Sequence, residues 1–313
     1  MHKYFPVLVV CCGLVYGQAA AIVPLIHTAA MAGDFGAAQK SLNLYRAAAG
    51  VTPEYLEAFS WMGRGRLNAK QLDAAEANAA EVRKLCEAAL KSRKLDAEAH
   101  LPIALGAAIE VHAQALTQLN RRDEAVLFLR DEIRRWQGTS ITMRLQKNLN
   151  LLTLEGKPVP EIEVSQGVGG RKAMPLRTHR GHPVLIFLWA HWCSDCKAEV
   201  GIIEKLMSVY GPRGLVVVAP TQHYGYVAGG EDATPAVETQ YIRDVFARFY
   251  APLGKVEAPL SEQNFKRFGV STTPTLLLVD ANGIVRLYNP GAMSYDALAG
   301  RIETLLPRPA SKG

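Results

Sequence analysis

The strongest hydrophobic pattern in the chain is an uninterrupted apolar run at residues 184–190, VLIFLWA. Its length suits one strand buried on both faces and is too short for a helix. After a Trp-rich turn and the sequence Cys193-Ser194-Asp195-Cys196, apolar residues recur every three or four positions, at Val200, Ile203, Leu206, Met207 and Tyr210. This change of period predicts a strand, a turn and a helix, with Cys193 at the N-terminus of the helix.

The rest of the C-terminal half alternates between short apolar runs and polar turns, which is typical of a sheet with helices. We expect strands at 161–164, 174–176, 215–219, 276–279 and 284–288, and helices at 239–250 and 294–306. The sequence Asp-Ala-Asn-Gly at 280–283 predicts a hairpin turn. Residues 222–238 are polar and glycine-rich, so we expect a long loop there.

Residues 22–155 have a different pattern, rich in alanine, leucine and charged helix formers, and we expect this region to be all helical. Three polar turns followed by alanines recur at 32–38, 67–75 and 119–125, which predicts three or four helical hairpins. The segment from Glu155 to Pro160 contains two prolines and marks the boundary with the next domain.

The first 21 residues have the pattern of a secretory signal peptide, with Lys3, an apolar run at 7–16 and small residues at the predicted cleavage sites. An uncleaved anchor over residues 4–26 is the alternative. Either interpretation places everything that follows outside the cytoplasm. The predicted organisation is therefore a signal peptide at 1–21, a helical domain at 22–155, an α/β domain at 156–308 and a tail at 309–313.

Composition adds little to this pattern. The net charge of +6 comes from Lys and Arg scattered through both domains, which indicates solvated faces instead of a nucleic-acid site. The sequence contains no phosphate-binding loop, no Ser/His/Asp order typical of hydrolases and no cluster of residues at metal-ligand spacing, so we expect no bound cofactor and no metal.

The positions of the five cysteines indicate which chemistry the protein carries out. Of five, Cys11 and Cys12 lie in the targeting segment, and Cys86 lies in a helix-periodic stretch, where we expect a small buried apolar side chain more than a regulatory thiol. The remaining Cys193 and Cys196 form a lone Cys-x-x-Cys, which in an exported protein indicates redox chemistry.

The position of this pair predicts its roles. Unpaired backbone N–H groups and the helix dipole favour an anion at a helix N-terminus, so Cys193 should ionise readily and attack, and Cys196 should resolve. Such a pair passes electrons by exchange between dithiol and disulfide.

The strand, the Trp-x-x-Trp-Cys-x-x-Cys motif, the helix and the downstream Thr272-Thr273-Pro274-Thr275 resemble the thioredoxin superfamily, and more narrowly its TlpA/ResA-like extracytoplasmic disulfide reductases. The resemblance runs from roughly 156 to 306. It implies an α/β thioredoxin-like fold, a central mixed sheet flanked by helices, with the Thr273–Pro274 bond in cis beside the cysteines. The all-α region ahead of it is similar to degenerate tetratricopeptide helix pairs.

The resemblance also suggests supporting residues. Trp192 is expected to shield the disulfide. Glu199 corresponds to a glutamate that tunes thiol protonation in ResA-like proteins, the alternative being an ordinary first-turn helix glutamate. Asp195, between the cysteines, is expected to disfavour the thiolate and so to make the reduced protein a stronger reductant.

Two residues depart from the family pattern. Phe187 replaces the buried acid of thioredoxin, and Gly201 replaces a proline that kinks the helix. In the predicted loop, His223, Tyr224 and Tyr226 are candidates for contacting a partner, unless the loop packs on itself.

We therefore predict an extracytoplasmic disulfide reductase, an enzyme that acts on protein thiols and disulfides and is re-reduced by a membrane electron donor. An oxidase or isomerase of the same fold is one alternative. Another is a partner-binding protein in which the helical region binds the partner and the thioredoxin-like domain is an accessory module. A peroxidase is disfavoured because its characteristic cysteine context is missing.

Overall fold

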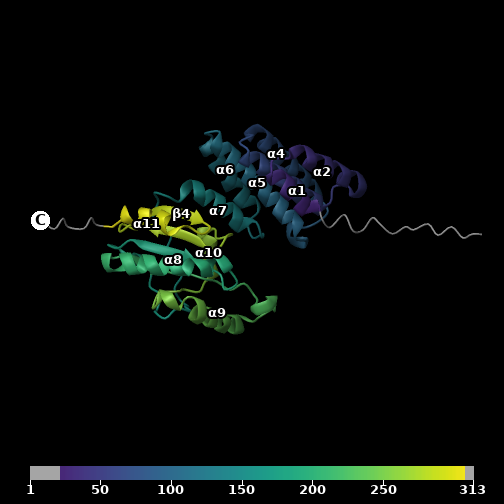
Figure 1. Cartoon of the computed structure of the whole chain (residues 1–313). Helices are drawn as coiled ribbons and strands as arrows, with labels where there is room; N and C mark the ends of the chain where they lie inside the picture. The colour runs from purple at the N-terminus through teal and green to yellow at the C-terminus, as the bar shows by residue number, and fades with distance from the viewer. Residues whose placement is uncertain (1–21, 307–313) are drawn as a thin grey trace, which may run out of the picture. The chain divides into compact units, whose positions relative to one another are not determined.

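The computed structural model describes residues 22–306. The predicted signal peptide at 1–21 and tail at 309–313 lie outside the described residues. The chain, drawn in Figure 1, divides into two compact units, Met1–Ala125 and Val126–Gly313.

The helical region predicted at 22–155 is confirmed, because every regular element from residue 22 to residue 153 is a helix. The α-helices are α1 (Ile22–Met31), α2 (Phe35–Ala49), α3 (Pro53–Asn68), α4 (Leu72–Ala89), α5 (His100–Gln118), α6 (Arg122–Arg135) and α7 (Thr142–Thr153). Sequence signals set some of their starts: the side chains of Asp34 and Thr52 cap α2 and α3 by accepting backbone N–H groups of Ala37 and Tyr55.

The three repeated turns of the first unit share one backbone geometry. In each, a residue with positive φ follows the helix: Gly33 (φ 79°), Lys70 (φ 61°) and Asn120 (φ 61°). In each, the next N–H bonds back to a carbonyl five residues earlier, from Asp34 to Ala29, from Gln71 to Arg66 and from Arg121 to Leu116, at 2.9, 2.9 and 2.8 Å. This is the Schellman ending of a helix, and the three turns singled out in the sequence share it.

The second unit is built on a mixed four-stranded sheet in the order β2-β1-β3-β4. The strands are β1 (Val184–Leu188), β2 (Val216–Val218), β3 (Thr275–Val279) and β4 (Val285–Pro290). β1 pairs in parallel with β2 and antiparallel with β3, and β3 pairs antiparallel with β4. The predicted α/β thioredoxin-like class, a central mixed sheet flanked by helices, is therefore confirmed.

Helices cover both faces of this sheet, so β1 is buried throughout, as its unbroken apolar run predicted. Leu185 and Phe187 point into a core formed with α8 (Ser194–Tyr210), α9 (Pro235–Phe249) and α11 (Tyr295–Glu303). Ile186 and Leu188 point into a second core on the other face, which includes two aromatic residues of α10 (Glu262–Phe268).

Helix α7 belongs to this second unit although it continues the helical half of the sequence. The Asn150 side chain donates a hydrogen bond of 2.9 Å to the carbonyl of Phe268, and the backbone of α7 lies so close to Gly269 that a Cβ there would meet Lys147 N at 2.6 Å. The compact units therefore divide inside α6, before the change from helix to strand that the sequence marks near residue 155.

Two of the expected strands are wrong. Residues 161–164 form no strand, and residues 174–176 lead into the short 3-10 helix Leu176–His179. Isolated bridges flank these segments, at Pro158 with Ile284, Gly167 with Pro259 and Arg171 with Glu257, and none of them falls within 161–164 or 174–176. The hairpin turn is confirmed: Asp280 accepts the N–H groups of Asn282 and Ile284, both at 2.9 Å, and Gly283 has a φ of 75°.

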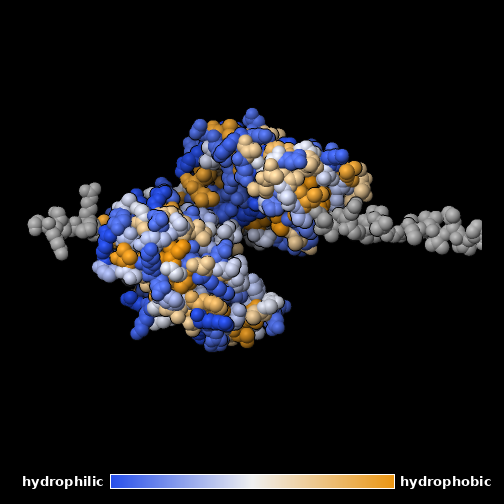
Figure 2. All heavy atoms as spheres, viewed as in Figure 1, coloured by the Kyte–Doolittle hydropathy of each residue, from blue (hydrophilic) through white to orange (hydrophobic). Residues whose placement is uncertain are grey.

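The face seen in Figure 2 is mostly hydrophilic, with separate apolar patches. Across residues 22–306, none of the helices is both long and apolar enough to cross a membrane.

Candidate redox site

Cys193 and Cys196 form a disulfide at the point where β1 gives way to α8. Cys193 is the N-cap of α8, with extended backbone, and its Sγ accepts the backbone N–H of Cys196 at 3.0 Å. In the reduced protein the same N–H and the helix N-terminus would stabilise a thiolate on Cys193. The order in which Cys193 attacks and Cys196 resolves stays a prediction.

The cysteines differ slightly in exposure, with Cys193 3% and Cys196 0% exposed in this disulfide form. Trp192, directly before them, is 49% exposed, and its ring contacts Tyr224 edge-on at 5.6 Å. A large aromatic surface therefore stands next to the sulfur that an incoming thiol must reach.

The Thr273–Pro274 peptide bond is cis, as the family resemblance implied. Pro274 directly precedes β3, and the first residue of β3, Thr275, pairs with Leu188 at the end of β1. This register places Thr273 and Pro274 at the same end of the sheet as the cysteines.

Glu199 is buried one turn beyond Cys196, with 2% of its surface exposed. Its Oε1 accepts the backbone N–H of Met293 at 3.2 Å. Burial raises the pKa of the Glu199 carboxyl, and this hydrogen bond lowers it by less. Glu199 thus holds its proton to a higher pH than an exposed glutamate does, which suits a group that exchanges a proton with a neighbouring thiol.

Asp195 lies on the exposed side of the first turn of α8. There water screens its charge, and the helix dipole favours it, so its repulsion of a thiolate is weaker than the sequence alone suggested. Phe187 is buried in the core beside Tyr250, and α8 continues through Gly201 as one helix to Tyr210.

The predicted loop packs on the site. Tyr224 and Tyr226 are half-buried, and both rings contact the imidazole of His191, which lies two residues before Cys193. His223 is bonded to Thr239 through Nε2 at 2.8 Å.

Sequence reasoning missed His191 and its partner Glu238. The two residues come from segments far apart in the sequence, and the one local signal was a histidine inside the Trp-x-x-Trp motif.

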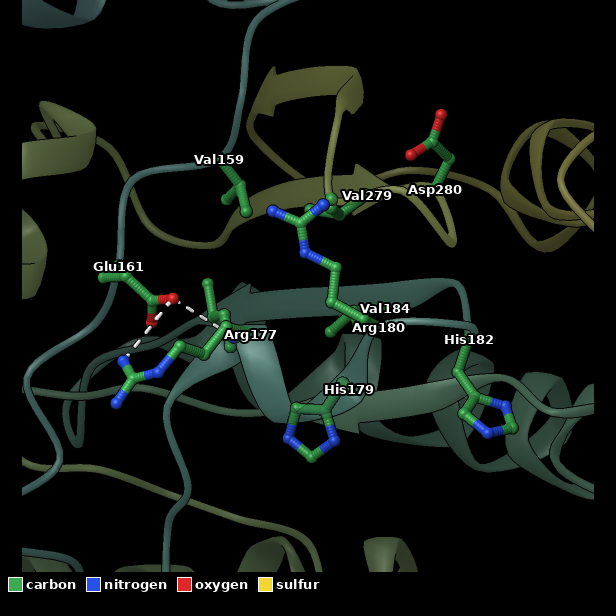
Figure 3. Close-up of a pocket in the computed structure, with 11 residues that line it drawn as sticks. Val159, Glu161, Arg177, His179, Arg180, His182, Val184, Val279 and Asp280 are labelled. Atoms are coloured by element: carbon green, nitrogen blue, oxygen red, sulfur yellow. Dashed lines mark hydrogen bonds and ion pairs between the residues drawn. The ribbon is translucent and has the colours of Figure 1, made fainter.

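A separate hollow lies at the opposite end of β1, beside Val184 and Val279 (Figure 3). Its polar lining includes Arg177, which pairs with Glu161, and Arg180, which donates to the carbonyl of Asn282. These cations are already engaged within the protein, and the cysteines do not line the hollow. Within residues 22–306, no group of three or more His, Cys, Asp or Glu side chains is placed to hold a metal ion.

The mixed sheet, the cysteine pair at a helix N-terminus and the cis proline before β3 define a thioredoxin-like domain. Residues 171–306 match the family model described as a thioredoxin-like domain.

Among sequence relatives, the thiol-disulfide oxidoreductase ResA of Oceanobacillus iheyensis is 24% identical over 164 residues, covering 52% of this chain and 78% of ResA. The thiol:disulfide interchange protein DsbE of Pseudomonas fluorescens is 26% identical over 156 residues, covering 48% of this chain and 77% of DsbE. The chain is therefore similar to ResA and to DsbE over about half of its length.

Solved structures with a similar domain include a putative DsbE from Chlorobium tepidum, with a TM-score of 0.37, 22% identity and coverage of 48% of this chain and 96% of that one. A thiol-disulfide isomerase from Corynebacterium glutamicum has a TM-score of 0.40 and 15% identity, and the match covers 49% of this chain and 98% of that one.

Proposed function

We propose that this protein is an extracytoplasmic thiol-disulfide oxidoreductase that reduces disulfides in exported proteins. The observation that carries the proposal is the Cys193–Cys196 pair, with the Sγ of Cys193 at the N-cap of α8 and accepting a backbone N–H. The relatives named ResA and DsbE support it, because they are thiol-disulfide enzymes.

In this mechanism the Cys193 thiolate attacks one sulfur of a client disulfide. The client S–S bond breaks, a mixed disulfide forms, and the second client sulfur leaves as a thiolate and takes up a proton. Cys196 then gives its proton to a base, a role we assign to Glu199, and attacks the Sγ of Cys193. The Cys193–Cys196 disulfide forms, the first client sulfur leaves, and two electrons have passed to the client.

The cycle needs a dithiol that reduces the Cys193–Cys196 disulfide again. We propose a membrane electron donor for this step and protein disulfides as substrates, with Trp192 and the Thr273–Pro274 segment beside the exchanging sulfurs. Export by the segment at 1–21 would place the domain where such a donor and such clients occur.

The helical unit is proposed to bind a protein partner in the manner of tetratricopeptide repeats. The recurring turn at Gly33, Lys70 and Asn120 supports a repeat architecture. Exposed apolar side chains on its helices, such as Leu25 and Leu44, give a partner apolar surface to bury.

A trapping experiment tests the exchange chemistry. With Cys196→Ser, the mixed disulfide between Cys193 and a client protein should accumulate, because no resolving thiol remains. Cys193→Ser should abolish reduction of an insulin disulfide. Cys86→Ser is the matched control and should leave activity unchanged, since Cys86 is fully buried in the other unit. Equal trapping by Cys193→Ser would contradict the assigned roles.

The reduction potential decides the direction of electron flow. A value near or below about −250 mV supports a reductant, whereas one near about −120 mV makes the protein an oxidase that inserts disulfides. The same trapping pattern is expected in both cases, so the two experiments test separate parts of the proposal.

A further inference from the structure

A histidine is buried next to the turn that carries Cys193, the redox turn. His191 follows the end of β1 and is 1% exposed. Its ring lies edge-on to three tyrosine rings, those of Tyr224, Tyr226 and Tyr241, at centroid distances of 5.4, 5.3 and 5.2 Å. Neither of its ring nitrogens makes a hydrogen bond of regular geometry among the described residues.

The polar neighbour of this imidazole is a buried carboxylate. Nε2 of His191 lies 3.3 Å from Oε1 of Glu238, which is itself 1% exposed and sits in the first turns of α9. The same carboxylate accepts the backbone N–H groups of Tyr224 at 2.5 Å and Gly225 at 2.9 Å. Glu238 therefore ties the start of the 222–238 segment to both α9 and His191.

Contacts continue from this pair to the cysteines. The ring of Tyr224 touches both His191 and Trp192, and it also meets Phe265 in the second core of the sheet. Trp192 lies between His191 and Cys193 in the sequence. The His191–Glu238 pair is therefore connected to the turn that carries Cys193 in two ways, through the backbone of Trp192 and through the ring contacts of Tyr224.

We propose that His191 is a positioning residue for thiol-disulfide exchange, because with Glu238 it anchors the 222–238 segment against Trp192 and so fixes the turn that carries Cys193. The inference rests on the proposed exchange chemistry at Cys193. His191 acts through its neighbours and takes no part in the covalent steps.

The electrostatics make the anchor sensitive to pH. Burial lowers the pKa of His191, the carboxylate of Glu238 raises it by less, and the charges of Lys197 and His223 lower it further. Burial also raises the pKa of Tyr224 and Tyr226, so these phenols stay neutral near pH 7. Acidification then protonates the imidazole, so that a neutral neighbour of Glu238 becomes a buried cation. The strength of the His191–Glu238 contact, which holds the 222–238 segment, changes as a result.

The test compares this pair with a second His–Glu pair in the same domain, in which Glu257 is buried and His179 is partly buried. Glu257 is also 1% exposed, lies 3.4 Å from Nε2 of His179 and accepts the N–H of Met174 at 2.8 Å. His179 lines the hollow at the opposite end of β1, so the pair matches the first in chemistry but not in place. The full chain would carry His191→Phe or Glu238→Gln, with His179→Phe and Glu257→Gln as controls.

The measurement is the rate at which dithiothreitol reduces the Cys193–Cys196 disulfide, from pH 5 to pH 8. We expect His191→Phe and Glu238→Gln to slow it about tenfold at neutral pH, and the two controls to leave it unchanged. His191→Gln, which keeps an N–H group that can reach Glu238 but does not titrate, should restore the rate at neutral pH and remove the part of the pH dependence that comes from His191.

A second measurement requires no substitution. The imidazole resonances of His191 should differ between the oxidised and the reduced protein, because coupling between two sites is reciprocal. Equal rates in all four variants, or identical His191 resonances in the two redox states, would overturn the inference. A wild-type disulfide that does not exchange with thiols would instead refute the proposed function itself.

Discussion

The clearest electrostatic prediction is that Glu199→Gln lowers the pKa of the Cys196 thiol. Both residues lie on α8, three positions apart, and both are almost fully buried. At this helical spacing the side chains start about 5–6 Å apart. With an effective dielectric constant of about 20, two like charges at about 5.5 Å repel by about 3 kcal/mol. This energy corresponds to about two pKa units.

The direction follows from which charge the substitution removes. Burial raises the pKa of Glu199, but once the carboxyl ionises its charge opposes a thiolate on Cys196. Glutamine keeps the shape of the side chain and an oxygen that accepts the N–H of Met293, and it has no charge. The Cys196 thiol should therefore ionise about two pH units lower in the variant.

Thiolate absorbance in the ultraviolet, followed against pH, measures this midpoint. Cys193→Ser prevents the disulfide, and serines at Cys11 and Cys12 remove two further thiols. Burial raises the pKa of Cys86 to about 12, so that thiol ionises last and does not interfere.

The control is Glu204→Gln, which removes the same charge from an exposed position on the same helix. Water screens that charge, so the midpoint should stay near that of the parent protein. If Glu199→Gln moves the midpoint no further than Glu204→Gln does, the electrostatic reasoning is wrong.

Three predictions concern stability. Lys70→Gly should raise the free energy of unfolding by about 1 kcal/mol in urea titrations, because Lys70 has a φ of 61° that glycine adopts without strain; a loss of stability would contradict this. Gly269→Ala should lower it by more than about 1 kcal/mol, because the new Cβ would meet the α7 backbone. Gly254→Ala is its control, with a similar φ of 64° and open space, and an equal loss in both would refute the role of the close approach. Finally, the raised pKa of Glu199 means that its contribution to stability is complete below its ordinary value and is lost as the pH rises through the folded value. Glu199→Gln should therefore lose less stability between pH 4 and pH 8 than wild type, and parallel curves would exclude this contribution.

The differences between the predicted and the observed elements have local causes. α10 was missed because its seven residues are too few to show a helical period. The start of α9 was placed four residues late, although Thr234 and Pro235 form a cap and a first-turn proline that mark it. Residues 161–164 and 174–176 carry apolar residues between polar turns, as strands do, but they pair with no strand, and composition does not report pairing.

Some residues of the site could be predicted from local sequence, and others depend on contacts between distant segments. The roles predicted for Cys193 and Cys196 rested on a strand, a turn and a helix that are contiguous in the chain, and the structure places both cysteines as expected. His191 and Glu238 lie on segments separated by β2 and the long loop, so no local pattern joined them.

Sequence by itself determined the buried strand, the helix that begins at the cysteines, the helical first half and the hairpin turn, because each depends on residues close together in the chain. The tertiary structure alone decided which residues are buried and which distant segments meet. It decided that α7 packs on the sheet domain, that Glu199 is buried and Asp195 exposed, and that the Glu238 carboxylate from α9 lies beside the imidazole of His191. These features depend on distant segments meeting in a low-dielectric interior, where burial shifts pKa values and pairs charges, and no period or motif in the chain encodes such meetings.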